Sequence, residues 1–168
     1  MAALQRLTRD DLPRLRQFWI EHWGGEEMIS RGQVYRPEQL EGFVVEEGSA
    51  WIGLLTFFIK DGECEVTSLD SLREGQGIGS KLIDRAVEEA LARGCKRLFL
   101  ITTNDNLNAL GFYQKRGLKS LLCTAARSTN HERENRVFHW LECITSRYAM
   151  RLNWRCHCCG HLVKLLPL

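Results

Sequence analysis

The first residues of the chain have the pattern of a short strand, which then changes to helical spacing. Residues 3–8 predict an edge strand, and Thr8 and Asp11 have the separation of a helix-capping box. Apolar side chains then recur every three or four residues until Gly24–Gly25, which predicts a helix that ends at these glycines. Residues 26–42 are interpreted as a loop or a short helix.

Three extended apolar runs follow, at residues 43–47, 50–59 and 63–71. Gly48 separates the first two runs, and Asp61-Gly62 separates the last two. An Asp-Gly pair between apolar runs is a strong β-hairpin signal, because the favoured two-residue turns need a positive φ. The three runs therefore predict an antiparallel meander.

Helix and strand patterns alternate after the meander. Residues 78–91 predict an amphipathic helix, residues 97–103 predict a buried strand, and residues 106–116 predict a further helix. A strand–helix–strand order makes parallel neighbours, so the 63–71 and 97–103 strands are expected to pair in parallel. The predicted fold class is α/β (α+β layered), with a mixed sheet that combines the antiparallel meander and a central parallel strand pair flanked by helices.

The composition is that of an ordinary soluble globular domain, since 44% of the 168 residues are hydrophobic and 26% are charged. The formal net charge of +2 is too small to favour nucleic acid or an anionic membrane as a partner. No apolar run approaches the length of a membrane span, and the N-terminus has no apolar signal core. We therefore expect a cytoplasmic protein.

The seven cysteines are unevenly placed. Five lie in the last third of the chain: Cys123, Cys143, Cys156, Cys158 and Cys159. A cytoplasmic protein is not expected to form a disulfide framework. Cys64 and Cys95, which stand apart from the others, are interpreted as small buried hydrophobic residues.

Three glycines, at positions 75, 77 and 79, stand at the start of the 78–91 helix. Glycine lets the backbone turn tightly and approach a ligand closely, and a helix start offers unpaired N–H groups with a partial positive charge. Together these features predict an anion site suited to a phosphate. The spacing fits neither a Walker loop nor the dinucleotide-binding fingerprint. On these glycines alone, a plain strand-to-helix turn is an equally good interpretation.

A second segment favours the phosphate interpretation. Residues 106–118, NLNALGFYQKRGL, fit the pattern N-x-x-A-x-x-F-Y-x-x-x-G-[FL]. The glycine turn fits [RQ]-x-x-G-x-[GA], except that Glu74 takes the first position. With both segments, and with Trp23 and the Ser-Arg-Gly at 30–32, the chain resembles a bacterial branch of the GNAT acetyltransferase superfamily from residue 1 to about 119. Gly111 also departs from the branch, which often has a larger residue there.

The resemblance implies an acetyl-CoA-dependent N-acetyltransferase, with acetyl-CoA as cosubstrate and a small-molecule or peptide amine as acceptor. The strand end at Leu69, Asp70 and Ser71 would pair its backbone with the pantetheine arm, and Asn106 would add a polar contact to the cofactor. Consecutive backbone N–H groups would hold the pyrophosphate, namely those of Gln76, Gly77, Ile78, Gly79 and Ser80.

The resemblance also implies that Tyr113 protonates the departing thiolate; an amphipathic core residue is the alternative. Glu63 and Glu65 alternate onto one face of the strand that leads to the turn, so either could take a proton from the acceptor amine. The alternative is that both are solvent-facing charges on a sheet edge. Three further side chains are interpreted as lining the acceptor site or, for the aromatic ones, as core: Trp19, Trp23 and Arg31.

The resemblance stops after about residue 119. We therefore divide the chain into a GNAT acetyltransferase core, 1–119, and an aberrant C-terminal tail, 120–168, that replaces the usual final strands and leaves the sheet without its last hairpin. The tail contains CHCCGH at 156–161, but six adjacent residues cannot close a tetrahedral zinc site alone, so we expect no metal. A metal-binding interaction protein built on this segment is the alternative.

A shifted reading frame would explain the tail. The branch usually ends in a segment like DEIELE, and one coding choice for DEIELEM, read one base later, gives the MRLNWRC of residues 150–156. We predict that the frame slipped near Lys119–Ser120, in the gene or in its sequencing. Stop codons in the offset frame between 120 and 150 would exclude this. Two alternatives to an active enzyme follow: a non-catalytic acyl-CoA-binding module, or an inactive product of a frameshifted gene.

Overall fold

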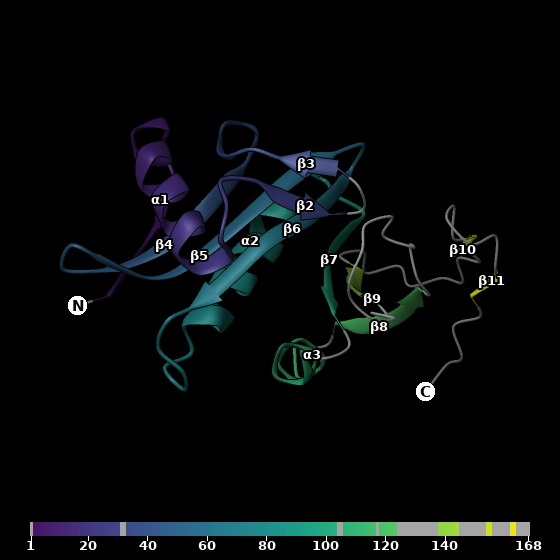
Figure 1. Cartoon of the computed structure of the whole chain (residues 1–168). Coiled ribbons are helices and arrows are strands. Elements are labelled where there is room, and N and C mark those ends of the chain that lie inside the picture. The colour runs from purple at the N-terminus through teal and green to yellow at the C-terminus, as the bar shows by residue number, and fades with distance from the viewer. Residues whose placement is uncertain are drawn as a thin grey trace, which may run out of the picture.

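The structure is a computed structural model that describes residues 2–30, 33–103, 106–116, 118–123, 138–144, 154–155 and 162–163 (Figure 1). The helices are α1 (Leu12–Trp23), α2 (Ile78–Ala92) and α3 (Leu107–Gln114), with 3-10 turns η1 (Arg9–Asp11) and η2 (Pro37–Gln39). The strands of the main sheet are β1 (Ala3–Arg6), β4 (Glu41–Glu47), β5 (Ala50–Lys60), β6 (Glu63–Ser71), β7 (Arg97–Thr103), β8 (Lys119–Cys123) and β9 (Phe138–Ile144). The remaining strands are β2 (Met28–Ser30), β3 (Gln33–Tyr35), β10 (Trp154–Arg155) and β11 (Leu162–Val163).

The predicted fold class is confirmed within these residues. The seven main strands lie in the order β1-β4-β5-β6-β7-β9-β8, with β4, β5 and β6 as the antiparallel meander and β6 parallel to β7. The first helix also forms as predicted. The Thr8 backbone N–H donates to the Asp11 carboxylate at 2.8 Å, and α1 ends at Gly24, whose φ of 77° is left-handed.

Helices α1 and α2 cover opposite faces of the sheet (Figure 1). Leu54 of β5 packs with Trp19 of α1, and the next residue, Leu55, packs in the cluster that contains Leu82 of α2. A strand that is buried on both faces needs apolar residues at consecutive positions, which explains the unbroken apolar run of β5. Burying each such leucine contributes roughly 1.5–3 kcal/mol.

Residues 26–42 contain the expected short helix as the 3-10 turn η2. The short hairpin β2–β3 ahead of it corrects the loop interpretation. Its two strands are antiparallel, and Met28 lies opposite Tyr35 while Ile29 lies opposite Val34. Met28 and Tyr35 are buried, whereas Ile29 and Val34 are 75% and 43% exposed. Strands of three residues contain too few alternating positions for a period of two to be recognised in the sequence.

Strand β6 is paired with β7 only in its first half. The parallel ladder runs from Glu63 opposite Arg97 to Val66 opposite Leu100. The register between β5 and β6 then shifts, so that Thr67 is an additional residue on β6, as in a β-bulge. Beyond this point β6 keeps β5 as its partner and, among the described strands, has none on its other edge. Figure 1 shows β6 and β7 diverging, with α3 following β7.

The prediction that the sheet lacks its last hairpin is wrong. Strand β9 pairs antiparallel with β7 along all of Arg97–Thr103, and β8 pairs antiparallel with β9. The ladder consists of backbone hydrogen bonds, so short apolar segments such as KSLLC and FHWLECI can extend a sheet without the expected sequence. The division into a 1–119 core and a 120–168 tail stays a prediction, and the CHCCGH segment lies outside the described residues.

Candidate active site

The glycine turn between β6 and α2 presents backbone donors. Gly75 and Gly77 have φ values of 75° and 72°, a left-handed conformation that other residues rarely adopt. The first amide of α2 that bonds back into the turn is that of Lys81, which donates to the Gly77 carbonyl at 3.1 Å. Within the described ranges, no acceptor is recorded for the five amides predicted to bind pyrophosphate, those of Gln76, Gly77, Ile78, Gly79 and Ser80. The turn therefore has the geometry of an anion site.

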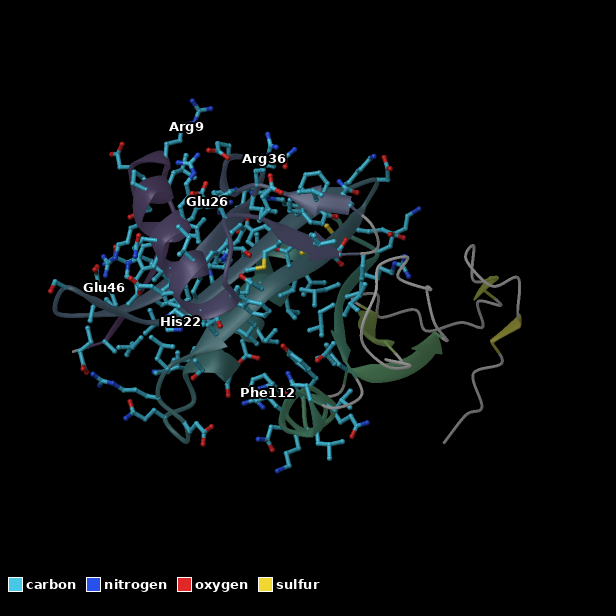
Figure 2. The ribbon with its side chains drawn as sticks, viewed as in Figure 1. Arg9, His22, Glu26, Arg36, Glu46 and Phe112 are labelled. Carbon is cyan, nitrogen blue, oxygen red and sulfur yellow. The ribbon has the colours of Figure 1, made fainter. Side chains whose placement is uncertain are left out.

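The turn is fixed by close packing from two sides. A Cβ atom on Gly79 would lie 3.0 Å from the ring of Phe112 on α3, which is labelled in Figure 2. A Cβ atom on Gly53 of β5 would lie well inside 3.0 Å of the Ile78 side chain, at the start of α2. The absence of side chains at these two glycines lets the sheet and α3 approach the first turn of α2 directly.

The end of β6 lies beside this turn. Leu69, Asp70 and Ser71 are paired with β5 and lie on the part of β6 that has no described partner on its other edge. Backbone groups on such an edge are available to an extended ligand. The predicted pantetheine contacts are compatible with this geometry and stay a prediction.

A polar cluster connects α1, β6 and α3. The Trp23 indole N–H donates to the Asp70 carboxylate at 3.1 Å, next to His22, which Figure 2 labels at the end of α1. Burial raises the pKa of Asp70, and the hydrogen bond from Trp23 opposes this. Burial, together with the charge of Asp70, raises the pKa of Tyr113, which is 7% exposed. The phenol of Tyr113 is therefore a protonated, potential donor at neutral pH.

The two candidate bases differ in their surroundings. Glu65 is 6% exposed, and its two carboxylate oxygens accept from the hydroxyls of Ser30 and Tyr35, the latter at 2.9 Å. Glu63 is half-buried and forms an ion pair with Arg97 at 2.8 Å. The interpretation of both as solvent-facing charges is therefore wrong for Glu65.

Both glutamates line one polar cavity of about 290 Å³. Its walls come from β2, β3, β5, β6, β7 and the turn after β5: Ser30, Gln33, Tyr35, Phe58, Lys60, Asp61, Glu63, Glu65 and Phe99. Tyr113 lies elsewhere, near Asp70. At about 3.3 Å per residue, the Cα atoms of Glu65 and Asp70 are roughly 16 Å apart along β6.

The remaining residues that the sequence assigns to the site do not line this cavity in the described part of the chain. The Asn106 side chain accepts from the Ala109 backbone N–H at 3.2 Å and is the N-cap of α3. Trp19 is fully buried in the core, so it does not line an acceptor site. Arg31 lies outside the described part of the chain.

The sequence does not reveal that Ser30 and Tyr35 contact Glu65. Ser30 attracted notice only through the family pattern, and nothing local connects either hydroxyl with Glu65, more than 25 positions away. Cys64 and Cys95 are buried in the apolar core, as predicted. Over the described residues, no helix is long and apolar enough to cross a membrane.

Comparisons with known proteins identify the family of the chain. The model of the acetyltransferase (GNAT) family matches residues 3–118. The uncharacterized protein YdhI of Bacillus subtilis is 45% identical over 104 residues, which are 61% of this chain and 65% of YdhI, so the match spans less than two thirds of that relative.

Solved acetyltransferases share the fold. An N-acetyltransferase from Staphylococcus aureus Mu50 has a TM-score of 0.65 at 17% identity, covering 87% of this chain and 99% of its own. The yncA protein of Salmonella typhimurium, solved with its cofactor acetyl-CoA, has a TM-score of 0.67 at 13% identity, covering 89% and 96%. These similarities confirm the predicted GNAT-like mixed sheet.

Proposed function

Because the chain belongs to the acetyltransferase (GNAT) family, we propose that it transfers an acetyl group from acetyl-CoA to a primary amine of a small molecule or peptide. The observation that carries this proposal is the glycine turn at the start of α2, whose amides have no recorded acceptor among the described residues. An anion bound there would receive several N–H donors and the favourable end of the helix dipole. We place this reaction in the cytoplasm, in line with the sequence prediction.

The cosubstrate would lie along β6 and α2. The amides of residues 76–80 would hold the pyrophosphate, and the open edge of β6 at Leu69–Ser71 would pair with the pantetheine arm. That the related yncA structure contains acetyl-CoA supports this choice. The side-chain oxygen of Asn106 is already used as the cap of α3, which leaves its amide nitrogen for the proposed polar contact.

We assign Glu65 rather than Glu63 as the general base. An amine must lose a proton before it can attack, and Glu65 would accept that proton directly or through one water. Glu65 has neutral hydroxyl partners, whereas the carboxylate of Glu63 is already paired with the Arg97 guanidinium. Proton acceptance by Glu63 would break an ion pair, so Glu65 is the less costly base.

Tyr113 would complete the reaction as the general acid. When the amine nitrogen bonds to the thioester carbonyl carbon and the carbon–sulfur bond breaks, the phenol would give its proton to the sulfur. Burial and the nearby charge of Asp70 keep this phenol protonated until that step. The attacking nitrogen would lose its second proton as the amide forms, and this proton would restore the Tyr113 phenol. The products are an amide and the free thiol of coenzyme A, and the proton that Glu65 takes from the ammonium is released to solvent.

The test combines turnover with binding. Thiol release from acetyl-CoA is measured against a panel of primary amines, and coenzyme A binding is measured by calorimetry. We expect turnover with at least one amine. Glu65→Gln and Tyr113→Phe should each lower kcat by about 10²–10⁴-fold, the range for a positioned acid or base, while coenzyme A still binds. Glu63→Gln is the matched control and should retain most of the activity.

Two other outcomes identify the alternatives. Binding of coenzyme A without turnover on any amine would indicate a non-catalytic acyl-CoA-binding module. A chain that shows neither coenzyme A binding nor turnover would indicate an inactive product of a frameshifted gene. The frame-corrected chain should then recover both binding and turnover. A chain with an intact frame that binds no coenzyme A would refute the proposal.

A further inference from the structure

The carboxylate of Glu65 is held by two hydroxyl groups from one hairpin. Ser30 ends β2 and donates to one oxygen of Glu65, while Tyr35 ends β3 and donates to the other at 2.9 Å. Both residues lie on the inward face of the hairpin, because their neighbours Ile29 and Val34 alternate onto the exposed face. The hairpin thus donates to both oxygens of a buried carboxylate.

The chemical nature of these two donors distinguishes Glu65 from Glu63. Hydroxyls orient a carboxylate without cancelling its charge, whereas the Arg97 guanidinium opposite Glu63 does cancel it. An ionised carboxylate has about four lone-pair positions, so two remain free on Glu65 after both hydrogen bonds. These free positions are what a proton acceptor facing the cavity needs.

The Tyr35 donor is fixed by packing. The Tyr35 ring is 3% exposed, and its centroid is 5.4 Å from that of Phe58, which lines the same cavity. Its cross-strand partner Met28 is also buried, in the same apolar cluster. Because packing on both sides fixes the Tyr35 ring, its hydroxyl restricts the orientation of the Glu65 carboxylate to which it donates.

We infer that Ser30 and Tyr35 are positioning residues that hold the Glu65 carboxylate in the orientation for proton acceptance. The inference rests on the proposed function, in which Glu65 is the base. Neither hydroxyl exchanges a proton with the acceptor, because both act through Glu65. The hairpin β2–β3 is then the element that orients the reactive carboxylate.

The experiment measures kcat and KM for Ser30→Ala, Tyr35→Phe and Ser30→Thr, with the amine that the panel identifies as the best acceptor. Each loss of a hydroxyl should lower kcat by about tenfold or more, with KM for acetyl-CoA unchanged, which is the usual range for one hydrogen bond to a charged group. Ser30→Thr restores a hydroxyl and should recover activity to within a few fold. Val34→Ala, on the exposed face, is the matched control and should match the parent.

A double-mutant cycle separates positioning from general structural damage. In a Glu65→Gln background, Ser30→Ala and Tyr35→Phe should change the residual rate by less than about twofold, because their target is gone. An equal loss in both backgrounds would overturn the inference. Activity of both single variants within about twofold of the parent would also overturn it.

The readout distinguishes this inference from the proposed function. If the parent acetylates amines and the hydroxyl variants are unaffected, only the positioning role fails; if the parent binds coenzyme A but acetylates no amine, both fail. Circular dichroism melting checks folding. If Tyr35→Phe does not fold, the comparison of Ser30→Ala with Ser30→Thr decides the question.

Discussion

Replacing Gly53 with alanine should displace the start of α2 and weaken coenzyme A binding. Gly53 lies on β5 directly beneath the first turn of α2, and it pairs with Ser71 at the end of β6. An added Cβ would lie well inside 3.0 Å of the Ile78 side chain, 3.1 Å from that of Leu82 and 3.3 Å from the Asp70 carbonyl. Since carbon atoms prefer a separation of about 3.5–4.0 Å, Ile78 would have to move by roughly 1 Å.

The expected change in the free energy of unfolding for Gly53→Ala combines two opposing effects. Overpacking of a well-packed core usually costs about 1–3 kcal/mol, whereas a Gly-to-Ala change returns about 0.4–1 kcal/mol through the unfolded chain. We therefore expect Gly53→Ala to lower the free energy of unfolding by roughly 1–2 kcal/mol. Ile78 carries one of the five proposed phosphate-binding amides, so the same shift should weaken two or three charge-assisted hydrogen bonds and lower coenzyme A affinity at least about tenfold.

Urea denaturation gives the free energy of unfolding, and calorimetry gives the Kd for coenzyme A. Gly25→Ala is the matched control, because a Cβ there meets no atom within 4 Å and the residue has no positive φ; both quantities should stay at the parent values. A Gly53→Ala protein with parental stability and a Kd within twofold of the parent would refute the reasoning, since it would mean that the first turn of α2 is not held by this contact.

Three further predictions concern the turn, the acid and an ion pair. Gly77→Ala meets no steric contact but forces alanine to a φ of 72°, so stability should fall by about 1–2 kcal/mol in urea denaturation, and coenzyme A should bind more weakly. Asp70→Asn removes a negative charge beside Tyr113 and should lower the pKa of that phenol, measured by NMR titration of labelled tyrosine. The Arg93 guanidinium holds the pKa of Glu41 below its usual value. The ionised Glu41 therefore stabilises the folded protein fully above about pH 4.3, and this stabilisation is lost as the pH falls through the lowered pKa. Glu41→Gln should reduce the fall of the melting temperature at acid pH.

Each of these predictions has a clear contradicting result. Parental stability and binding in Gly77→Ala would mean that the left-handed turn is not required. An unchanged tyrosine titration in Asp70→Asn would separate that carboxylate from Tyr113. A steep acid limb that persists in Glu41→Gln would assign the pH dependence to other carboxylates.

The sequence predicts the elements whose signals are local. The Asp61-Gly62 pair identifies the hairpin between β5 and β6, and the glycines before α2 identify the turn, because each conformation depends on one or two residues with positive φ. The environment of Glu65 could not be predicted in this way. Its burial depends on the hairpin β2–β3, whose strands are too short to show a pattern, and on hydrogen bonds between residues 30 or more positions apart.

The bulge and the end of the sheet also depend on tertiary context. Nothing in the sequence near Thr67 signals an additional residue, because the register of β6 is set by β5 on one side and by β7 on the other. The last hairpin was predicted to be absent because residues 120–168 lack the expected family segment. Strand β9 nevertheless pairs with β7, since an exposed strand edge can bind any chain segment that supplies backbone donors and acceptors.

The divergence of β6 from β7 after Val66 makes one stretch of backbone unusually open to solvent exchange. Amides on that edge of residues 67–71 should exchange with deuterium far faster than those of the flanking ladder, because opening them requires no neighbouring strand to separate. A molecule that pairs with this edge should slow that exchange selectively. Deuterium uptake at those of residues 67–71 whose amides point away from β5 would then report occupancy even where no product is formed.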